Sequence, residues 1–139
     1  MIFVDTGFLV ALFNKRDRDH PRVIEVFRTF ESKSLPDLLL TTDHVVFETI
    51  TFLVKKVSHE RAIYVGERLY AGKMARIHQA SFEEQMAAFE YLKRHRDKTY
   101  SAVDCLSFVV MEKRGIGEAL AIDDDFTHRF TARPGPRPK

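Results

Sequence analysis

Two short apolar runs of this 139-residue chain each end in an aspartate. Asp5 follows the run Met1–Val4, and Asp123 follows the run Ala119–Ile122. An uninterrupted apolar run, without alternation, indicates a strand that is buried on both faces, as in a parallel sheet covered by helices. Because ligand sites in such sheets lie at the carboxyl ends of the strands, we expect these two aspartates to lie at one edge of the sheet.

Segments with a helical pattern separate the expected strands. Pro21 suits the first turn of an amphipathic helix, and Ser81 followed three residues later by Glu84 has the spacing of a capping box. We further expect strands at residues 38–41 and 75–79, and helices from Gly7, from Thr42 or Asp43 to about Val57, from Ser58 to about Gly72, and from Ser101 to a left-handed cap at Gly115. Strands that alternate with helices of about 10–15 residues predict an α/β sandwich around a central parallel sheet.

The length of the chain bounds its organisation. A chain of 139 residues fits one domain, since domains commonly have about 100–200 residues. We expect this domain to occupy residues 1–130, with a loop at Ser34–Asp37 before the second strand. The end of the chain is rich in proline, so we expect residues 131–139 to form a disordered tail.

The composition bears on the location of the protein. The single cysteine, Cys105, excludes an intramolecular disulfide, and its apolar surroundings predict an inert buried thiol. No apolar run approaches the roughly 20 residues that a membrane-spanning helix needs. We therefore expect a cytoplasmic protein that does not enter a membrane.

A third carboxylate, Asp104, interrupts an apolar helical segment. Eight of the ten residues 102–111 are apolar, so this helix is expected to be largely buried. An acid in such surroundings is costly unless something pairs with it. A structural role is also open, because Ser101 and Asp104 have the spacing of a capping box. Asp5 has a similar alternative as the N-cap of the helix that follows it.

The remaining acidic candidates are less specific on their own. Glu48 falls on the side of its helix away from the apolar face, together with Thr51 and Lys55. This position suits either a solvated helix face or a residue that lines an open groove. Asp123–Asp125 is a run of three acids after a strand. It fits a surface turn, or, because adjacent like charges repel, a site with a counterion.

A divalent cation would account for these carboxylates together. The sequence shows no evident basic partners for them, whereas converging oxygens are the ligands that hard cations prefer. Carboxylates favour Mg²⁺ or Mn²⁺ over zinc, and the six histidines lack metal-ligand spacing. Such a cation polarises a phosphoryl oxygen and lowers the pKa of an attacking water. The pattern points to metal-dependent chemistry on a phosphate-bearing substrate.

The net charge of +2 conceals an uneven distribution. If four carboxylates cluster in one site, the rest of the molecule carries +6. Basic residues gather at Lys93–Lys98, at Lys113–Arg114 and near the C-terminus. An acidic pocket in a basic surface suits a polyanionic substrate, although each basic residue taken alone fits an ordinary solvated face.

Four segments occur in one order along nearly the whole chain: Ile2–Leu12, Val46–Thr49, Ser101–Phe108 and Ala121–Phe126. Together they resemble the PIN domain, and within it the VapC-like ribonuclease toxins of prokaryotic toxin–antitoxin pairs. The resemblance implies an α/β/α sandwich with a central parallel sheet. It also implies a Mg²⁺- or Mn²⁺-dependent endoribonuclease that acts on RNA, forms a homodimer and is silenced by a cognate antitoxin.

The resemblance also implies roles for individual residues. Carried over by position, the catalytic and metal-binding acids are Asp5, Glu48, Asp104 and Asp123, with the first and third of these as the principal ligands. Thr6 would orient a ligand or a water molecule, and Asp125 would assist. The chain departs from the family at Ala121, where many relatives carry Thr or Ser, and in its proline-rich tail.

Two other functions remain open from the sequence. An aspartate after the first strand is also typical of phosphatases and aspartyl-phosphate proteins, in which Asp5 would be the nucleophile. Gly7, however, stands where the phosphatase pattern has a second acid. The other alternative is a non-catalytic module of the same fold that binds RNA or protein. Candidate surfaces for partner proteins are the helices at residues 21–31 and 58–70.

Overall fold

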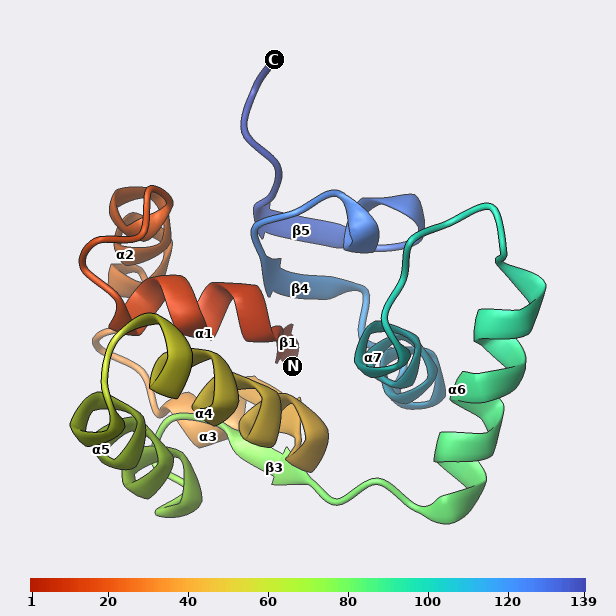
Figure 1. Ribbon diagram of the computed structural model, residues 1–139, viewed down its shortest axis with the longest axis horizontal. Coiled ribbons are helices and arrows are strands. Elements are labelled where there is room, and N and C mark those ends of the chain that lie inside the picture. The colour runs from red at the N-terminus through yellow and green to blue at the C-terminus, as the bar shows by residue number, and fades with distance from the viewer.

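Five parallel strands form the centre of the computed structural model, which describes residues 1–139 (Figure 1). Their order across the sheet is β3-β2-β1-β4-β5. They are β1 (Ile2–Val4), β2 (Leu39–Thr42), β3 (Arg76–His78), β4 (Glu118–Ala121) and β5 (Thr131–Pro134). The expected α/β fold with a central parallel sheet is confirmed. Because every strand pairs in parallel and β1 is central, the segments that follow β1, β2 and β4 meet at one edge of the sheet.

The helices form two groups, one on each side of the sheet. In Figure 1, α1, α4 and α5 lie to the left of the strands, and α6 and α7 lie to the right; the packing of α4 on α5 and of α6 on α7 is the most extensive between helices. The bounds are α1 (Thr6–Phe13), α2 (His20–Arg28), α3 (Leu35–Leu38), α4 (Asp43–Lys56), α5 (His59–Tyr70), α6 (Phe82–Arg94), α7 (Ala102–Arg114) and the short 3-10 helix η1 (Asp125–His128).

Local capping signals set most of the helix ends. The Thr42 hydroxyl accepts the Val45 N–H at 3.2 Å at the start of α4, and Ser58 does the same for α5. Ser81 begins α6 with the expected capping box. Gly115 ends α7 in the left-handed conformation, with φ of 68°. These caps satisfy backbone groups that helix ends would otherwise leave without partners.

An aromatic cluster in the core holds the site-bearing segments together. Phe108 of α7 meets Phe126 of η1 edge to face, with ring centroids 5.0 Å apart, and Phe126 stacks near Phe3 of β1 at 6.3 Å. All three side chains are almost completely buried. Since β1, α7 and η1 each carry or adjoin a candidate acid, this cluster fixes the relative positions of those acids.

The expectation of a disordered tail from residue 131 is wrong for its first part. Thr131–Pro134 forms β5, which pairs in parallel with β4. The tail is held further by Arg22, whose Nη2 donates to the Gly135 carbonyl at 2.7 Å, and by Arg137, whose Nε lies 2.8 Å from Asp19 Oδ1. Proline is compatible with this strand because β5 lies at the edge of the sheet, and Pro134 is its last residue.

A smaller correction concerns the segment before the second strand. Residues 34–37 were expected to be a loop, but Leu35–Leu38 forms one helical turn with proline in its first turn. The strand itself is shifted by one residue, to Leu39–Thr42. None of the helices combines the length and the apolar composition that a membrane crossing would need.

Candidate active site

The four carboxylates singled out from the sequence line one pocket at the carboxyl edge of the sheet. This pocket has a volume of about 270 Å³ and receives Asp5, Glu48, Asp104 and Asp123, with Thr6 beside them. The side chains come from the end of β1, from α4, from the start of α7 and from the segment after β4. The structure therefore brings together acids that are up to 118 positions apart in the chain. We call this hollow the acidic pocket.

Asp5 is the most deeply buried of these acids. Its backbone N–H donates to the Leu120 carbonyl at 3.0 Å, which fixes it between β1 and β4. It occupies the N-cap position of α1, yet its side chain makes no capping hydrogen bond, so the capping alternative does not account for it. Burial raises the pKa of Asp5 well above its ordinary value, and the charges of Asp104, Asp123 and Glu48 raise it further. No basic residue forms a salt bridge with it.

Asp104 combines the two roles that its sequence left open. Its Oδ2 accepts the Ser101 N–H at 2.9 Å, and the Ser101 hydroxyl accepts the Asp104 N–H at 3.0 Å, so the capping box is formed. The same side chain lines the acidic pocket. Burial raises the pKa of Asp104 and the charge of Glu48 adds to this rise, while the hydrogen bonds from Ser101 oppose it. Capping and membership of the site are therefore compatible.

Glu48 lines the acidic pocket from α4. Its neighbour Thr49 is fully buried and Phe47 is 69% exposed, so Glu48 lies at the boundary between core and solvent. Of the two alternatives that the helix pattern left open, the structure favours the groove-lining position.

The three acids that follow β4 lie in different environments. Asp123 lines the acidic pocket, and its Oδ1 accepts the Asp125 N–H at 3.2 Å. Asp125 itself is not part of the pocket lining. Burial and the charges of Asp123 and Asp104 raise the pKa of Asp125 to about 6. The pKa of Asp123 is also raised, by desolvation and by Asp104. Asp124 is exposed.

Thr6 carries a buried hydroxyl without a partner. Its side chain lines the acidic pocket, and Oγ1 makes no hydrogen bond with any protein group. Buried hydroxyls are nearly always hydrogen-bonded, since leaving one unpaired costs free energy. An orphan hydroxyl in the wall of a pocket is therefore suited to a polar ligand or a bound water.

Sequence reasoning missed three residues that also line the acidic pocket. Phe52 and Lys56 lie on α4 one and two turns beyond Glu48, and Asp17 comes from the loop after α1. The four-residue spacing of Glu48, Phe52 and Lys56 could have revealed the first two, because residues four apart share a helix face. Asp17 had no such local signal, since it reaches the site only through the fold of its loop.

The donor set of the acidic pocket fits a hard divalent cation. Its polar lining is dominated by carboxylate and hydroxyl oxygens, and no histidine or cysteine contributes. No three of these acidic side chains are close enough together to form a complete metal cage. A cation held here would therefore keep several water ligands, which is the ordinary state of protein-bound Mg²⁺.

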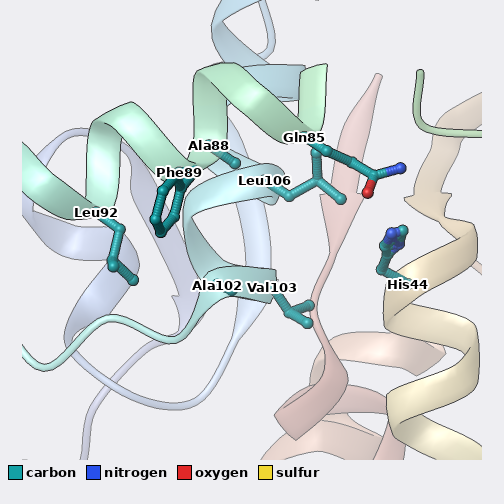
Figure 2. Close-up of a pocket in the computed structure, with 8 residues that line it drawn as sticks. All are labelled: His44, Gln85, Ala88, Phe89, Leu92, Ala102, Val103 and Leu106. Carbon is teal, nitrogen blue, oxygen red and sulfur yellow. The ribbon is translucent and has the colours of Figure 1, made fainter. Parts of the chain in front are cut away.

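A second hollow, of different chemistry, lies between α4, α6 and α7. It has a volume of about 180 Å³ and contains no acid (Figure 2). Phe89, Leu92 and Leu106 supply its apolar walls, and His44 and Gln85 are its polar lining side chains. Because no carboxylate lines this hollow, the acidic pocket is the candidate site for metal-dependent chemistry.

Comparison with known proteins agrees with this fold. The family model of the PIN domain matches residues 2–129, which is nearly the whole chain. The chain belongs to the PIN-domain family. The four segments that resemble this family in the sequence all lie within the matched range.

Known relatives place the chain near the VapC toxins of this family. It is 36% identical over 127 residues to the 23S rRNA-specific endonuclease VapC20 of Mycobacterium tuberculosis, in strains CDC 1551 and H37Rv, covering 91% of this chain and 92% of the relative. The crystal structure of VapC20, a toxin that cleaves the sarcin–ricin loop, superimposes with a TM-score of 0.83 at 34% identity, over 92% of this chain and 94% of that one. The chain is thus a homologue of VapC ribonuclease toxins.

A more distant structure shares the fold alone. DNA-bound VapBC from Salmonella typhimurium matches with a TM-score of 0.60 at 13% identity, over 95% of this chain and 97% of that chain. The expected resemblance to the PIN domain and its VapC-like members is confirmed by these comparisons.

Proposed function

We propose that this protein is a metal-dependent endoribonuclease and the toxin of a toxin–antitoxin pair. The observation that carries the proposal is Asp5, a buried carboxylate without a basic partner, which shares one pocket with three other acids. Metal-free, such an arrangement is destabilised by desolvation and by repulsion between like charges. Binding of a divalent cation would offset this repulsion, which accounts for four acids in one pocket. The homology to a 23S rRNA endonuclease supports RNA as the substrate.

The acids have distinct roles in this proposal. Asp5 and Asp104 are the principal ligands of Mg²⁺ or Mn²⁺, and Glu48 and Asp123 complete the site directly or through water. When bound, the cation supplies a Lewis acid that polarises a phosphoryl oxygen and lowers the pKa of an attacking water. Thr6 orients a ligand or a water through its unpartnered hydroxyl. Asp125, whose backbone N–H donates to Asp123 Oδ1, assists this carboxylate.

Partner proteins are part of the proposal. A VapC-type toxin is expected to form a homodimer and to be silenced by a cognate antitoxin, in the cytoplasm and away from membranes. Of the two helices expected to form such interfaces, α5 exposes large apolar side chains, with Ile63 58% and Tyr70 55% exposed, whereas α2 exposes none. A surface that the sequence did not suggest lies on α6, where Phe82 is 74% and Phe89 50% exposed. We propose α5 and α6 as the surfaces that partner proteins cover.

The experiment is an RNA cleavage assay with matched variants. Purified protein is incubated with 23S rRNA and with a sarcin–ricin stem-loop in Mn²⁺, in Mg²⁺ or in EDTA, beside Asp5→Asn and Asp104→Asn. Asp37→Asn serves as the control, because Asp37 is an exposed acid before β2, at the opposite end of the sheet. We expect metal-dependent internal cleavage that falls by about 100-fold or more in the two site variants and is unchanged in the control.

Other outcomes would favour the remaining functions. Cleavage that persists in EDTA or in both site variants would contradict the metal-dependent mechanism. Covalent phosphorylation of Asp5 by an acyl-phosphate donor would indicate the phosphatase alternative. RNA binding without cleavage, unchanged by EDTA, would indicate a non-catalytic module.

A further inference from the structure

A basic pocket adjoins the acidic pocket at the C-terminal end of α4. It has a volume of about 470 Å³ and lies between the end of α1, the end of α4 and the start of α5. Its lining includes Phe13, Asn14, Lys15, Arg16, Lys56 and Arg61. Lys56 lines both pockets, so the two hollows are adjacent at this residue.

The cationic side chains of this pocket are not paired with acids in salt bridges. None of its four cationic side chains forms a salt bridge. Other arginines of the protein behave differently, since Arg22 and Arg137 both pair with Asp19. Four unpaired cations around one hollow create a positive potential that attracts anions, and the walls of the hollow concentrate it.

Two of the cations are held in place by neighbouring groups. Arg61 donates from Nε to the Phe13 carbonyl at 2.9 Å, and its guanidinium lies over the rings of Phe13 and Tyr64, at 5.7 Å and 5.3 Å from the centroids. The two terminal nitrogens of the guanidinium, Nη1 and Nη2, have no hydrogen-bond partner in the protein. Lys56 places its ammonium 5.5 Å from the centre of the Phe52 ring. Both charges are therefore partly pre-organised, which reduces the entropy that a bound ligand must overcome.

We propose that the basic pocket binds backbone phosphates of the RNA strand whose scissile phosphate enters the acidic pocket. The proposal rests on the proposed function. The two pockets bind different phosphates of one RNA strand. The carboxylates can hold a phosphate only through a cation, whereas the basic pocket can hold neighbouring phosphates directly. Arginine suits this task because its fork matches phosphate oxygens, and lysine adds a mobile point charge. Lys56, shared by both pockets, marks the passage of the strand from one to the other.

The test compares two double variants with the same change of charge. Lys15→Ala/Arg16→Ala removes two exposed cations of the basic pocket. Lys33→Ala/Lys73→Ala removes two exposed lysines that precede β2 and β3, at the opposite end of the sheet. Binding of a fluorescein-labelled sarcin–ricin stem-loop is measured by anisotropy in EDTA at several salt concentrations. Cleavage of the same RNA is measured in Mn²⁺, and thermal melting confirms that each variant is folded.

A phosphate subsite predicts a specific loss. The slope of log K against log salt should become shallower by about 0.7 for each lost contact, or about 1.4 for the double variant. Affinity should fall by about tenfold or more, and KM should rise with kcat unchanged, because the lost contacts are remote from the reacting phosphorus. The control variant should keep the slope and the KM of the wild type.

The outcomes separate this proposal from the proposed function. A wild type that cleaves RNA, with a double variant whose slope and KM match the control, would overturn the phosphate subsite and leave the nuclease intact. A wild type that binds RNA without cleaving it would contradict the nuclease, while the salt slope would still decide on the subsite. A wild type that does not bind RNA would overturn both.

Discussion

Ser101 and Asp104 exchange two hydrogen bonds at the start of α7, and the carboxylate that makes one of them also lines the acidic pocket. The distances are 2.9 Å from the Ser101 N–H to Asp104 Oδ2 and 3.0 Å from the Asp104 N–H to the Ser101 hydroxyl. The capping box therefore orients a side chain of the candidate site. Asp104 thus both caps α7 and lines the acidic pocket, so a substitution at Asp104 affects the helix cap and the site together.

Asp104→Asn should separate the two effects. The amide oxygen of asparagine can still accept from Ser101, while the repulsion with Asp5 and Glu48 disappears. In EDTA we expect the free energy of unfolding to rise by about 1 kcal/mol, or about 3 °C in Tm, and the stabilisation by Mg²⁺ to be lost. Differential scanning calorimetry with and without Mg²⁺ measures both quantities.

The matched control for this prediction is Ser101→Ala. It removes the hydroxyl of the capping box, so stability should fall by about 1 kcal/mol, while the response to Mg²⁺ persists. If Asp104→Asn instead lowered stability as Ser101→Ala does and kept its response to Mg²⁺, Asp104 would be only a helix cap.

Without metal, the acidic pocket should make stability fall as the pH rises. The pKa of Asp125 is raised from 3.8 to about 6 in the folded protein, chiefly by burial, so the folded state binds this proton more tightly than the unfolded state. The free energy of unfolding therefore decreases with pH between these values, and the raised pKa values of Asp5, Asp104 and Asp123 act in the same direction. Melting curves in EDTA from pH 4 to about pH 7 would reveal the decrease. Asp125→Asn should flatten it, and an unchanged profile in that variant would contradict the role of Asp125.

The sequence predicts the part of this fold that short-range chemistry controls. Thr42, Ser58 and Ser81 cap helices as expected, and Gly115 ends α7 in the left-handed conformation, because each signal lies within a few residues of the helix end that it determines. The buried strand Ile2–Val4 was recognisable because a strand covered on both faces is apolar throughout. These signals place the acids on strand ends and helix starts, which is sufficient to predict that they converge.

The features that sequence reasoning missed depend on contacts between distant segments. Thr131–Pro134 looks like a disordered tail, because its pairing with Glu118–Ala121 and its contacts with Arg22 leave no local pattern. Asp17 reaches the acidic pocket in the same way, through the course of a loop. The roles of the individual acids stay predictions, since a ligand set is decided by a bound cation and its waters rather than by position in the chain.

Glu84 should control the stability of the protein in acid. Burial alone would raise its pKa, but hydrogen bonds from the Ser81 N–H and from His78, with the charges of His78 and Lys113, lower it to about 2 from an ordinary 4.5. The folded state therefore binds this proton less tightly, and the stabilisation is present above pH 4.5 and lost as the pH falls towards about 2. Glu84 therefore makes stability rise with pH up to about 4.5, whereas the acidic pocket makes metal-free stability fall at higher pH.

The variant Glu84→Gln tests this contribution. Glutamine can keep the capping box with Ser81, so the change removes mainly the charge. We expect about 2 kcal/mol lower stability at pH 6 and a weaker dependence on pH below 4.5, measured by urea unfolding in EDTA. Glu83→Gln, at an exposed position on the same turn, should change neither. Equal effects of the two variants would show that the network around Glu84 does not stabilise the fold.

Thr6 offers the most selective test of the site, because its hydroxyl serves nothing in the protein itself. Oγ1 is buried and unpartnered, so Thr6→Val, which is nearly the same shape, should leave stability in EDTA unchanged or higher by up to about 1 kcal/mol. If the hydroxyl orients a ligand or water, kcat should fall by about 10- to 100-fold, and Thr6→Ser should restore most of it. Single-turnover cleavage in Mn²⁺ and melting curves in EDTA measure the two quantities. Full activity in Thr6→Val would show that the pocket needs the shape of this side chain and not its hydroxyl, whereas lost activity with retained stability would identify a group kept for function at the expense of folding.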